Sequence, residues 1–227
     1  MTWPLPDRLV AGAIARRGRL EVFDRVEPAR MALLVVDMQR AWTDPAGPMH
    51  TPGTAAIIPA INALAAALRA RGGLVAWIRH SNAPPGDPLY WATYYDNFLR
   101  PERRARSLAT LAPGAPLHAL DPRLDIHAQD AQLLKYRFSA FTRNPADPET
   151  MLRARGIDTV IVAGVATNIC CESTARDAMM RDFRVFMPHD AVTAPDREAH
   201  EAGLASVLQV FADIRPAAAL AALIAAS

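Results

Sequence analysis

The chain contains 227 residues, of which 51% are hydrophobic and 21% are charged, and this composition excludes a disordered or fibrous protein. A chain of this length can bury roughly 70–75% of its unfolded surface in one domain. Because the formal net charge is only +2, nothing in the composition indicates binding to a nucleic acid or to a membrane. We expect a small-molecule ligand.

Residues 1–30 are expected to form an N-terminal arm that precedes a single domain at 31–227. The apolar stretch at 9–15 is short and its arginines follow it, which is unlike a signal peptide, so we expect a cytoplasmic protein. The longest apolar run, at 217–226, has about half the length that a membrane span requires. It is expected to form a C-terminal helix that packs on the domain or on another subunit.

Short apolar runs alternate with amphipathic segments along the domain, a pattern typical of a mainly parallel sheet with helices on both faces. The predicted strands are 31–39, 73–80, 131–138, 159–165 and 184–191. A sixth strand or a turn is expected just before Pro216. The predicted helices are 54–71, 147–155, 168–182 and 194–212. We therefore expect an α/β fold, Rossmann-like and three-layered, with a mainly parallel sheet of six strands.

Residues 81–130 depart from this alternation. The segment is rich in proline, aromatic residues and arginine, and it is longer than an ordinary connection, so we expect it to cover the active site. Trp91, Tyr95 and Phe98 follow one another at helical spacing, which is typical of a core or a subunit contact. The alternative is that one aromatic residue and one arginine close the site over a flat amide that carries a carboxylate. The arginines at 99–106 are otherwise expected to form a solvated face or an interface.

Three reactive side chains follow predicted strands. Asp37 closes the first, Lys135 lies near the end of the third, and Cys170 comes just after the fourth, at the start of a helix. Ligands bind beyond the carboxyl ends of the strands in an open α/β sheet, so we expect the three to meet there. Lys135 is the only lysine among 25 basic residues. Either it is a chance survivor on the surface, or its position needs a compact charge that arginine cannot supply.

The position of Cys170 indicates a nucleophile. A helix start and a nearby cation such as Lys135 both lower the pKa of a thiol from about 8.5. Asp37 can accept the thiol proton and pass it to a leaving group, and backbone amides at the helix start can hold an oxyanion. Cys171 is adjacent in sequence, a poor geometry for a structural disulfide, so both thiols are expected to be free.

Three segments carry a resemblance to a known family: LLVVDMQ at 33–39, LKYRFSAF at 134–141 and GVATNICCESTARDA at 164–178. Their order and spacing resemble those of the isochorismatase-like cysteine hydrolases, and the likeness extends from about residue 30 to residue 212. The family includes nicotinamidases, N-carbamoylsarcosine amidases, ureidoacrylate amidohydrolases and biuret hydrolases.

The resemblance implies that Asp37, Lys135 and Cys170 are the catalytic residues. It also implies a cis peptide bond between Val165 and Ala166, and an oxyanion hole made by the backbone amides of Ala166 and Cys170. By the same resemblance we expect a homodimer or a homotetramer.

The departures from the family pattern narrow the function. Nicotinamidases of the family bind a metal through an aspartate and two histidines after the second strand. Here His80 has no second histidine at ligand spacing, so we expect no metal, no other cofactor and no nicotinamidase activity. Members that cleave isochorismate do not need the cysteine, so the presence of Cys170 favours attack on a carbonyl group.

The sequence thus predicts a metal-independent cysteine amidohydrolase that cleaves a C–N bond of a small amide, ureide or carbamoyl compound through a thioester-type acyl-enzyme. The alternatives are a vinyl-ether hydrolase of the isochorismatase type and a non-catalytic binder of small molecules on the same fold. The candidate substrate-binding residues are Trp42, Trp91, Tyr95, Asn168 and Gln209.

Overall fold

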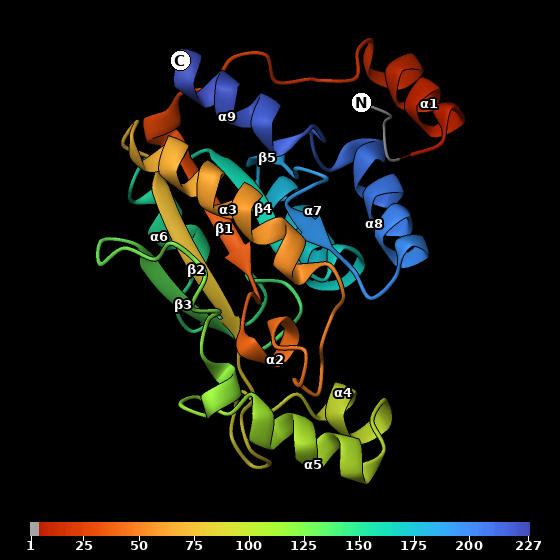
Figure 1. The fold of residues 1–227 in the computed structure, drawn as a ribbon, viewed down its shortest axis with the longest axis vertical. Coiled ribbons are helices and arrows are strands. Elements are labelled where there is room, and N and C mark those ends of the chain that lie inside the picture. Colours follow the sequence, from red (N-terminus) through yellow and green to blue (C-terminus); the bar gives the residue numbers. More distant parts are fainter. Residues whose placement is uncertain (1–4) are drawn as a thin grey trace.

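The structure is a computed structural model that describes residues 5–227, so residues 1–4 of the expected N-terminal arm lie outside the described residues. Its strands are β1 (Met31–Val36), β2 (Leu74–His80), β3 (Ala131–Lys135), β4 (Thr159–Val165), β5 (Arg184–Phe186) and β6 (Val192–Thr193). They form one sheet in the order β3–β2–β1–β4–β5, and β6 joins it by pairing with β4 (Figure 1). Every pairing between these strands is parallel.

The helices are α1 (Asp7–Arg17), α2 (Arg40–Thr43), α3 (Thr54–Arg69), α4 (Ala92–Asn97), α5 (Pro101–Thr110), α6 (Pro148–Arg153), α7 (Glu172–Met179), α8 (Arg197–Val210) and α9 (Ala217–Ala226). Shorter turns are η1 (Pro28–Arg30), η2 (Pro116–His118) and η3 (Thr167–Cys171), the last of which is π-helical. No helix within residues 5–227 is long and apolar enough to cross a membrane.

Different helices cover the two faces of the sheet. β1 is completely buried, and its side chains point alternately to the two faces. Leu33 and Val35 belong to a core shared with Ile61 of α3 and Leu220 of α9. Leu34 belongs to the opposite core, which includes residues of α6, α7 and α8. In Figure 1, α3 lies in front of the strands. The predicted three-layered α/β fold with a six-stranded, mainly parallel sheet is confirmed.

The sixth strand lies at a different place from the expected one. It is β6, which pairs with the end of β4. The segment before Pro216 runs beside β5 but makes only an isolated bridge, between Phe186 and Asp213. A ladder cannot continue through Pro216, because proline has no N–H to donate.

The described part of the expected N-terminal arm, residues 5–30, lies against the domain. Ala13 of α1 is buried in the same core as Leu204 of α8. Arg17, at the end of α1, donates to the backbone oxygens of Leu208 and Ala212. These contacts attach the first helix to α8.

The predicted cover segment, 81–130, divides into two parts. Residues 81–118, from here on called the cover lobe, contain α4, α5 and η2, and α4 and α5 stand beyond the carboxyl ends of the strands (Figure 1). Residues 119–130 run back along α3 instead, where Arg69 bonds to Asp125 and Asp130. The covering part is therefore shorter than predicted.

Candidate active site

Asp37, Lys135 and Cys170 meet beyond the carboxyl ends of the strands. Lys135 is the last residue of β3, and Asp37 directly follows β1. Asp37 has a φ of 55°, a left-handed conformation that aspartate tolerates better than most residues and that turns the chain sharply at the strand end. Cys170 lies in the π-helical turn η3, which follows β4. Because β1 lies between β2 and β4, the strand order reverses at this point, where α/β sheets bind their ligands.

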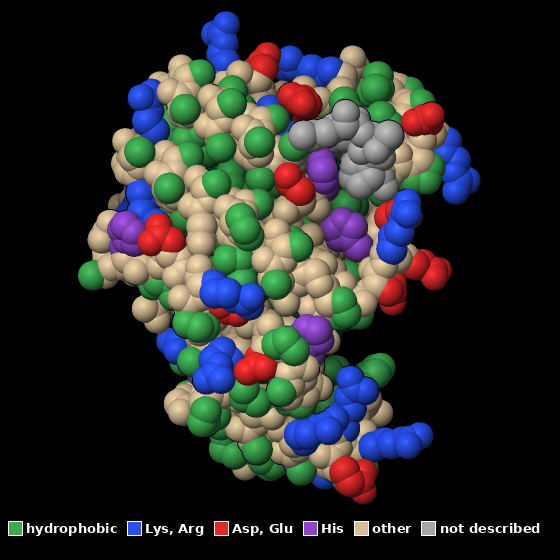
Figure 2. Space-filling model, viewed as in Figure 1, with side chains coloured by type: hydrophobic (Ala, Val, Ile, Leu, Met, Phe, Trp, Pro, Cys, Tyr) green, Lys and Arg blue, Asp and Glu red, His purple; other side chains and the backbone are tan. Residues whose placement is uncertain are grey.

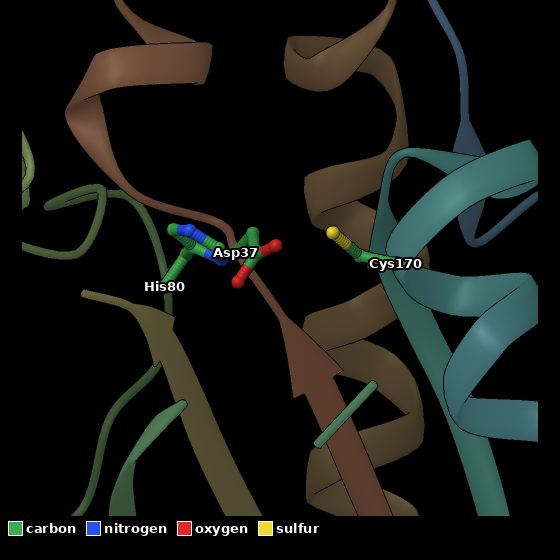
Figure 3. Close-up of side chains that lie close together, drawn as sticks. All are labelled: Asp37, His80 and Cys170. Carbon is green, nitrogen blue, oxygen red and sulfur yellow. The ribbon is translucent and has the colours of Figure 1, made fainter. Parts of the chain in front are cut away.

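Lys135 stands at the centre of the cluster. Its Nζ lies 2.8 Å from Oδ2 of Asp37 and donates to Sγ of Cys170 at 3.4 Å. It also contacts Nδ1 of His80 at 3.1 Å and donates to the backbone oxygen of Arg137 at 3.2 Å. The side chains of Lys135 and Asp37 are 0% and 1% exposed, so the ion pair is closed off from solvent. Figure 3 shows Asp37 and Cys170 facing one another, with His80 on the other side of Asp37.

A glycine allows β1 and β4 to approach closely at the site. Gly164 has a φ of 112°, and a Cβ atom there would lie 2.0 Å from the backbone oxygen of Val36. Only glycine fits this position. The close approach places the residue after β1, Asp37, against the turn that carries Cys170.

The turn that carries Cys170 is held from the other side by α8. A Cβ atom on Gly203 would lie 2.7 Å from Cα of Asn168, so the helix and the turn are in backbone contact. The peptide bond between Val165 and Ala166, just before the turn, is cis, at the position that the family resemblance implies. The predicted single helix over 168–182 is thus two elements, η3 and α7.

The charges in the cluster depend on one another. Burial raises the pKa of Asp37 against the opposing effect of Lys135. Burial acts to lower the pKa of Lys135, but the Asp37 carboxylate and the Cys170 sulfur outweigh it and raise that pKa. The pKa of His80 lies well below its usual value because the ring is buried next to Lys135, so the imidazole is neutral.

The expected lowering of the thiol pKa is wrong for the chain without substrate. Burial, and then the neighbouring Asp37 carboxylate, raise the pKa of Cys170 to about 12, and Lys135 offsets only part of this. Cys170 is therefore a neutral thiol at rest. Both cysteines are free, as predicted, and Cys171 is fully buried.

His80 belongs to the cluster, although the sequence singled it out only as a histidine without a second metal ligand. One ligating atom each of Asp37, His80 and Cys170 lie within 4.8 Å of one another, which is close enough for a shared metal ion. Lys135 Nζ already touches an atom of each of these residues. The three donors already surround the ammonium group of Lys135, which occupies the position that a metal ion would need. The cluster therefore fits a metal ion poorly. In the parallel pair β2–β3, His80 lies directly opposite Lys135. The alignment of these two strands would therefore have identified His80 as a member of the cluster.

A cavity of about 380 Å³ opens in front of the cluster. Asp37, His80, Ala166 and Cys170 form its base. The rest of the lining comes from the segment after β1, from the cover lobe and from three further positions: Trp42, Pro48, Met49, His50, Thr51, Tyr94, Tyr95, Leu99, Arg103, Arg106, Ser107, Leu111, Phe138, Ile169 and Pro195. Another hollow, of about 490 Å³, lies between the N-terminal segment and α7 and α8, and no residue of the cluster reaches it.

Of the candidate substrate-binding residues, Trp42 and Tyr95 line the cavity. Trp91 does not; its ring packs on Phe138 and under the guanidinium of Arg137. Asn168 does not line it either, because the turn presents its backbone to α8.

The prediction for Gln209 is wrong. Its side chain accepts a hydrogen bond from Arg16 at 2.8 Å, at the hollow away from the cluster. Gln209 and the buried Leu208 are neighbours on α8, and the helix directs Leu208 into the core and Gln209 outward. The cavity residues outside the candidate set include Tyr94, Arg103 and Arg106, all in the cover lobe. The sequence raised only the alternative that one aromatic residue and one arginine of this segment close the site, and it did not indicate which ones.

Comparison with known proteins agrees with this geometry. The isochorismatase domain matches residues 31–219. The chain belongs to the isochorismatase family. Ureidoacrylate amidohydrolase RutB of Methylobacterium radiotolerans is 34% identical over 209 residues, which cover 86% of this chain and 79% of that protein. Maleamate amidohydrolase of Pseudomonas putida is 30% identical over 185 residues, covering 81% of each chain.

Solved structures share the fold. A cysteine hydrolase from Pseudomonas syringae pv. phaseolicola superimposes with a TM-score of 0.81 at 28% identity, covering 91% of this chain and 97% of that one. N-carbamoylsarcosine amidase from Thermoplasma acidophilum gives a TM-score of 0.66 at 25% identity, covering 83% and 96%. The names of these relatives agree with the predicted class, a hydrolase of carbon–nitrogen bonds other than peptide bonds.

Proposed function

We propose that this member of the isochorismatase family is a cysteine amidohydrolase that cleaves the C–N bond of a small amide, ureide or carbamoyl compound through a thioester. The observation that carries the proposal is the contact of one buried ammonium, Lys135 Nζ, with both Asp37 and Cys170 at the base of a cavity. The arrangement supplies a nucleophile, a base and a fixed positive charge within hydrogen-bonding distance.

The first half-reaction forms the acyl-enzyme. Asp37 accepts the thiol proton while Sγ of Cys170 bonds to the substrate carbonyl carbon. The carbonyl electron pair moves to oxygen, where the backbone N–H groups of Ala166 and Cys170 stabilise it. When the carbonyl re-forms, the C–N bond breaks and the leaving nitrogen takes the proton from Asp37 as ammonia or an amine.

The second half-reaction releases the acid. Asp37 takes a proton from water as its oxygen attacks the thioester carbon, and the C–S bond breaks. The sulfur then recovers that proton from Asp37. Each half-reaction returns Asp37 to its carboxylate form, so one residue serves as base and acid in turn.

The pKa values of Cys170 and Asp37 suit direct transfer of a proton from the thiol to the carboxylate. A thiol with a pKa of about 12 does not ionise by itself at neutral pH. Transfer to Asp37 leaves the total charge of the cluster unchanged, because one buried anion replaces another beside Lys135. Burial raises the pKa of Asp37, which brings the carboxyl group closer to the thiol in proton affinity.

Ammonia release from a panel of ureides, carbamoyl amino acids, nicotinamide and simple amides tests the proposal. Cys170→Ala and Cys170→Ser should each lower turnover by about a thousandfold or more, because removal of a nucleophile disables the whole catalytic group. Cys171→Ala is the matched control and should keep most of the activity, since Cys171 lies in the core outside the cavity.

The rival functions give different results in the same assay. A vinyl-ether hydrolase would release pyruvate from isochorismate and would tolerate Cys170→Ala. A non-catalytic binder would release nothing from any compound. A Cys170→Ser variant with more than about a tenth of the wild-type rate would exclude the thioester, because a hydroxyl lacks the reactivity of a thiol.

A further inference from the structure

The cover lobe contributes two arginines to the lining of the cavity. Arg103 and Arg106 lie three residues apart on α5, so they are neighbours on one side of that helix. Both line the same cavity as Asp37 and Cys170, and both are exposed. Figure 2 shows basic side chains gathered on this lobe, next to the hollow that separates it from the rest of the molecule.

Neither arginine has a partner within residues 5–227. No carboxylate lies within ion-pair distance of either guanidinium, and neither donates a hydrogen bond to the described part of the chain. Arg104, which lies between them in sequence, behaves differently: its Nη1 pairs with Oδ1 of Asp96 at 2.8 Å, and it does not line the cavity. One helix thus carries an arginine that is paired with a carboxylate and two unpaired arginines that line the cavity.

The charge balance of the cavity lining points to an anion. Among the described residues that line it, the only acidic side chain is Asp37, and Lys135 already neutralises that carboxylate. Arg103 and Arg106 are left with two positive charges and no counter-charge. A guanidinium binds a carboxylate through two parallel hydrogen bonds, so this pair of arginines suits a carboxylate better than a neutral group.

Tyr94 relates the two arginines to the nucleophile. Burial raises the pKa of Tyr94, the charge of Arg103 opposes that shift, and the Cys170 sulfur adds to it. Tyr94 lines the same cavity as Arg103 and Cys170, and its phenol lies within electrostatic reach of both. Apolar side chains such as Leu99 and Phe138 line the same cavity and suit a short carbon chain.

We propose that Arg103 and Arg106 bind a carboxylate group of the substrate, so that the enzyme prefers amides or ureides in which a short chain separates the scissile carbonyl from a carboxylate. The inference rests on the proposed function and specifies its substrate class. The guanidinium groups hold one end of the substrate while its carbonyl lies over Sγ of Cys170.

Two alkylating reagents that differ in charge test the subsite without any turnover. Iodoacetate carries a carboxylate and iodoacetamide does not, and both form a C–S bond with Cys170 and release iodide. Mass spectrometry of the Cys170 peptide measures the two rates in the wild type, in Arg103→Gln/Arg106→Gln and in the matched control Arg104→Gln. We expect the ratio of the iodoacetate rate to the iodoacetamide rate to fall about tenfold or more in the double variant, since hydrogen bonds to charged groups are the strong ones.

The control should keep the wild-type ratio, because Arg104 faces Asp96 and not the cavity. An equal ratio in the double variant and the wild type, or a Cys170 that iodoacetate does not label in the wild type, would overturn the subsite.

Steady-state kinetics separate this inference from the proposed function. For an amide that carries a carboxylate, the double variant should raise KM about tenfold or more, and for the matching neutral diamide it should leave KM unchanged. If turnover depended on Cys170 but KM responded in the same way for the carboxylate-bearing amide and the neutral diamide, the subsite alone would be overturned. Charge-selective alkylation without release of ammonia or amine from any amide or ureide would support the subsite and overturn the proposed function.

Discussion

The buried cluster at the strand ends and the cover lobe are built in opposite ways. At the strand ends, Lys135 and Asp37 are buried and paired, and a glycine fixes the distance between the strands that position Asp37 and Cys170. In the cover lobe the helices are short, and the cavity-facing Arg103 and Arg106 are exposed and unpaired. A reaction needs fixed geometry, whereas a substrate must displace water and enter. The contrast supports both proposals: the chemistry at the strand ends and the choice of substrate in the lobe.

The largest effect expected on the sheet side concerns the thiol. With a pKa of about 12, Cys170 should react with iodoacetamide about tenfold faster per unit of pH from 7 to 10, because the thiolate fraction rises tenfold for each unit below the pKa. If the pKa of Cys170 were lowered instead, the rate of alkylation would reach a plateau within this pH range.

The variant Asp37→Asn sharpens the experiment. Because the Asp37 carboxylate raises the thiol pKa, its removal should shift the rise in rate toward lower pH. The rate of alkylation, followed by mass spectrometry of the Cys170 peptide, reports the shift. An unchanged profile would mean that Asp37 does not govern the thiol.

Lys135→Met removes the central charge and should lower kcat about a hundredfold, because it removes the cation that stabilises each anion of the reaction. The free energy of unfolding should also fall by about 3–5 kcal/mol, since a buried Asp37 loses its partner. Urea denaturation measures the second effect.

The double variant Lys135→Met/Asp37→Asn separates the two effects of that change. It should recover much of the stability, because no unpaired charge remains in the core, and none of the activity. Recovery of activity would contradict the assignment of Asp37 as the base.

Gly203→Ala tests how firmly the sheet side is fixed. The new Cβ atom would lie 2.7 Å from Cα of Asn168, so α8 and the turn that carries Cys170 must separate. We expect a loss of about 1–3 kcal/mol in stability and about tenfold in kcat, because Cys170 moves with its turn. Gly12→Ala on α1 is the control: nothing lies within 4 Å of its Cβ, and alanine should stabilise that helix slightly.

The same division explains which residues could be predicted from the sequence. Asp37, Lys135 and Cys170 follow continuous apolar runs, and the ends of parallel strands meet at one edge, so their positions followed from the pattern. Three of the five candidate substrate-binding residues, Trp91, Asn168 and Gln209, do not line the cavity. Gln209 lies on a helix, where neighbours in sequence point about 100° apart and composition does not reveal which one faces the site. The pKa of Cys170 could not be predicted either, because burial and an adjacent carboxylate are properties of the folded chain.

The cover lobe was the least predictable part. Its length and composition indicated a cover, but its aromatic stripe did not show which members reach the cavity: Tyr95 does, Trp91 does not, and Tyr94 was outside the predicted set. No strand register constrains such a segment. Arg103 and Arg104 look alike in sequence, and only the position of Asp96 in space distinguishes them.

The smallest effect tests how the lobe is fastened to the sheet. Tyr95 is buried and donates its hydroxyl to Oδ1 of Asn82, just after β2, and Nδ2 of Asn82 donates to the backbone oxygen of Ser107 on α5 at 2.8 Å. Tyr95→Phe removes the first bond. We expect KM to rise about threefold with kcat nearly unchanged, because a buried hydrogen bond contributes about 1 kcal/mol and the cluster is not touched.

Tyr90→Phe is the matched control in the same lobe. The Tyr90 hydroxyl bonds to Asp96 at 2.6 Å in an exposed position, where water replaces the lost bond, so neither constant should change. If Tyr95→Phe lowered kcat as strongly as Gly203→Ala, the lobe would be part of the catalytic geometry. The separation of chemistry in the sheet from selection in the lobe would then be wrong.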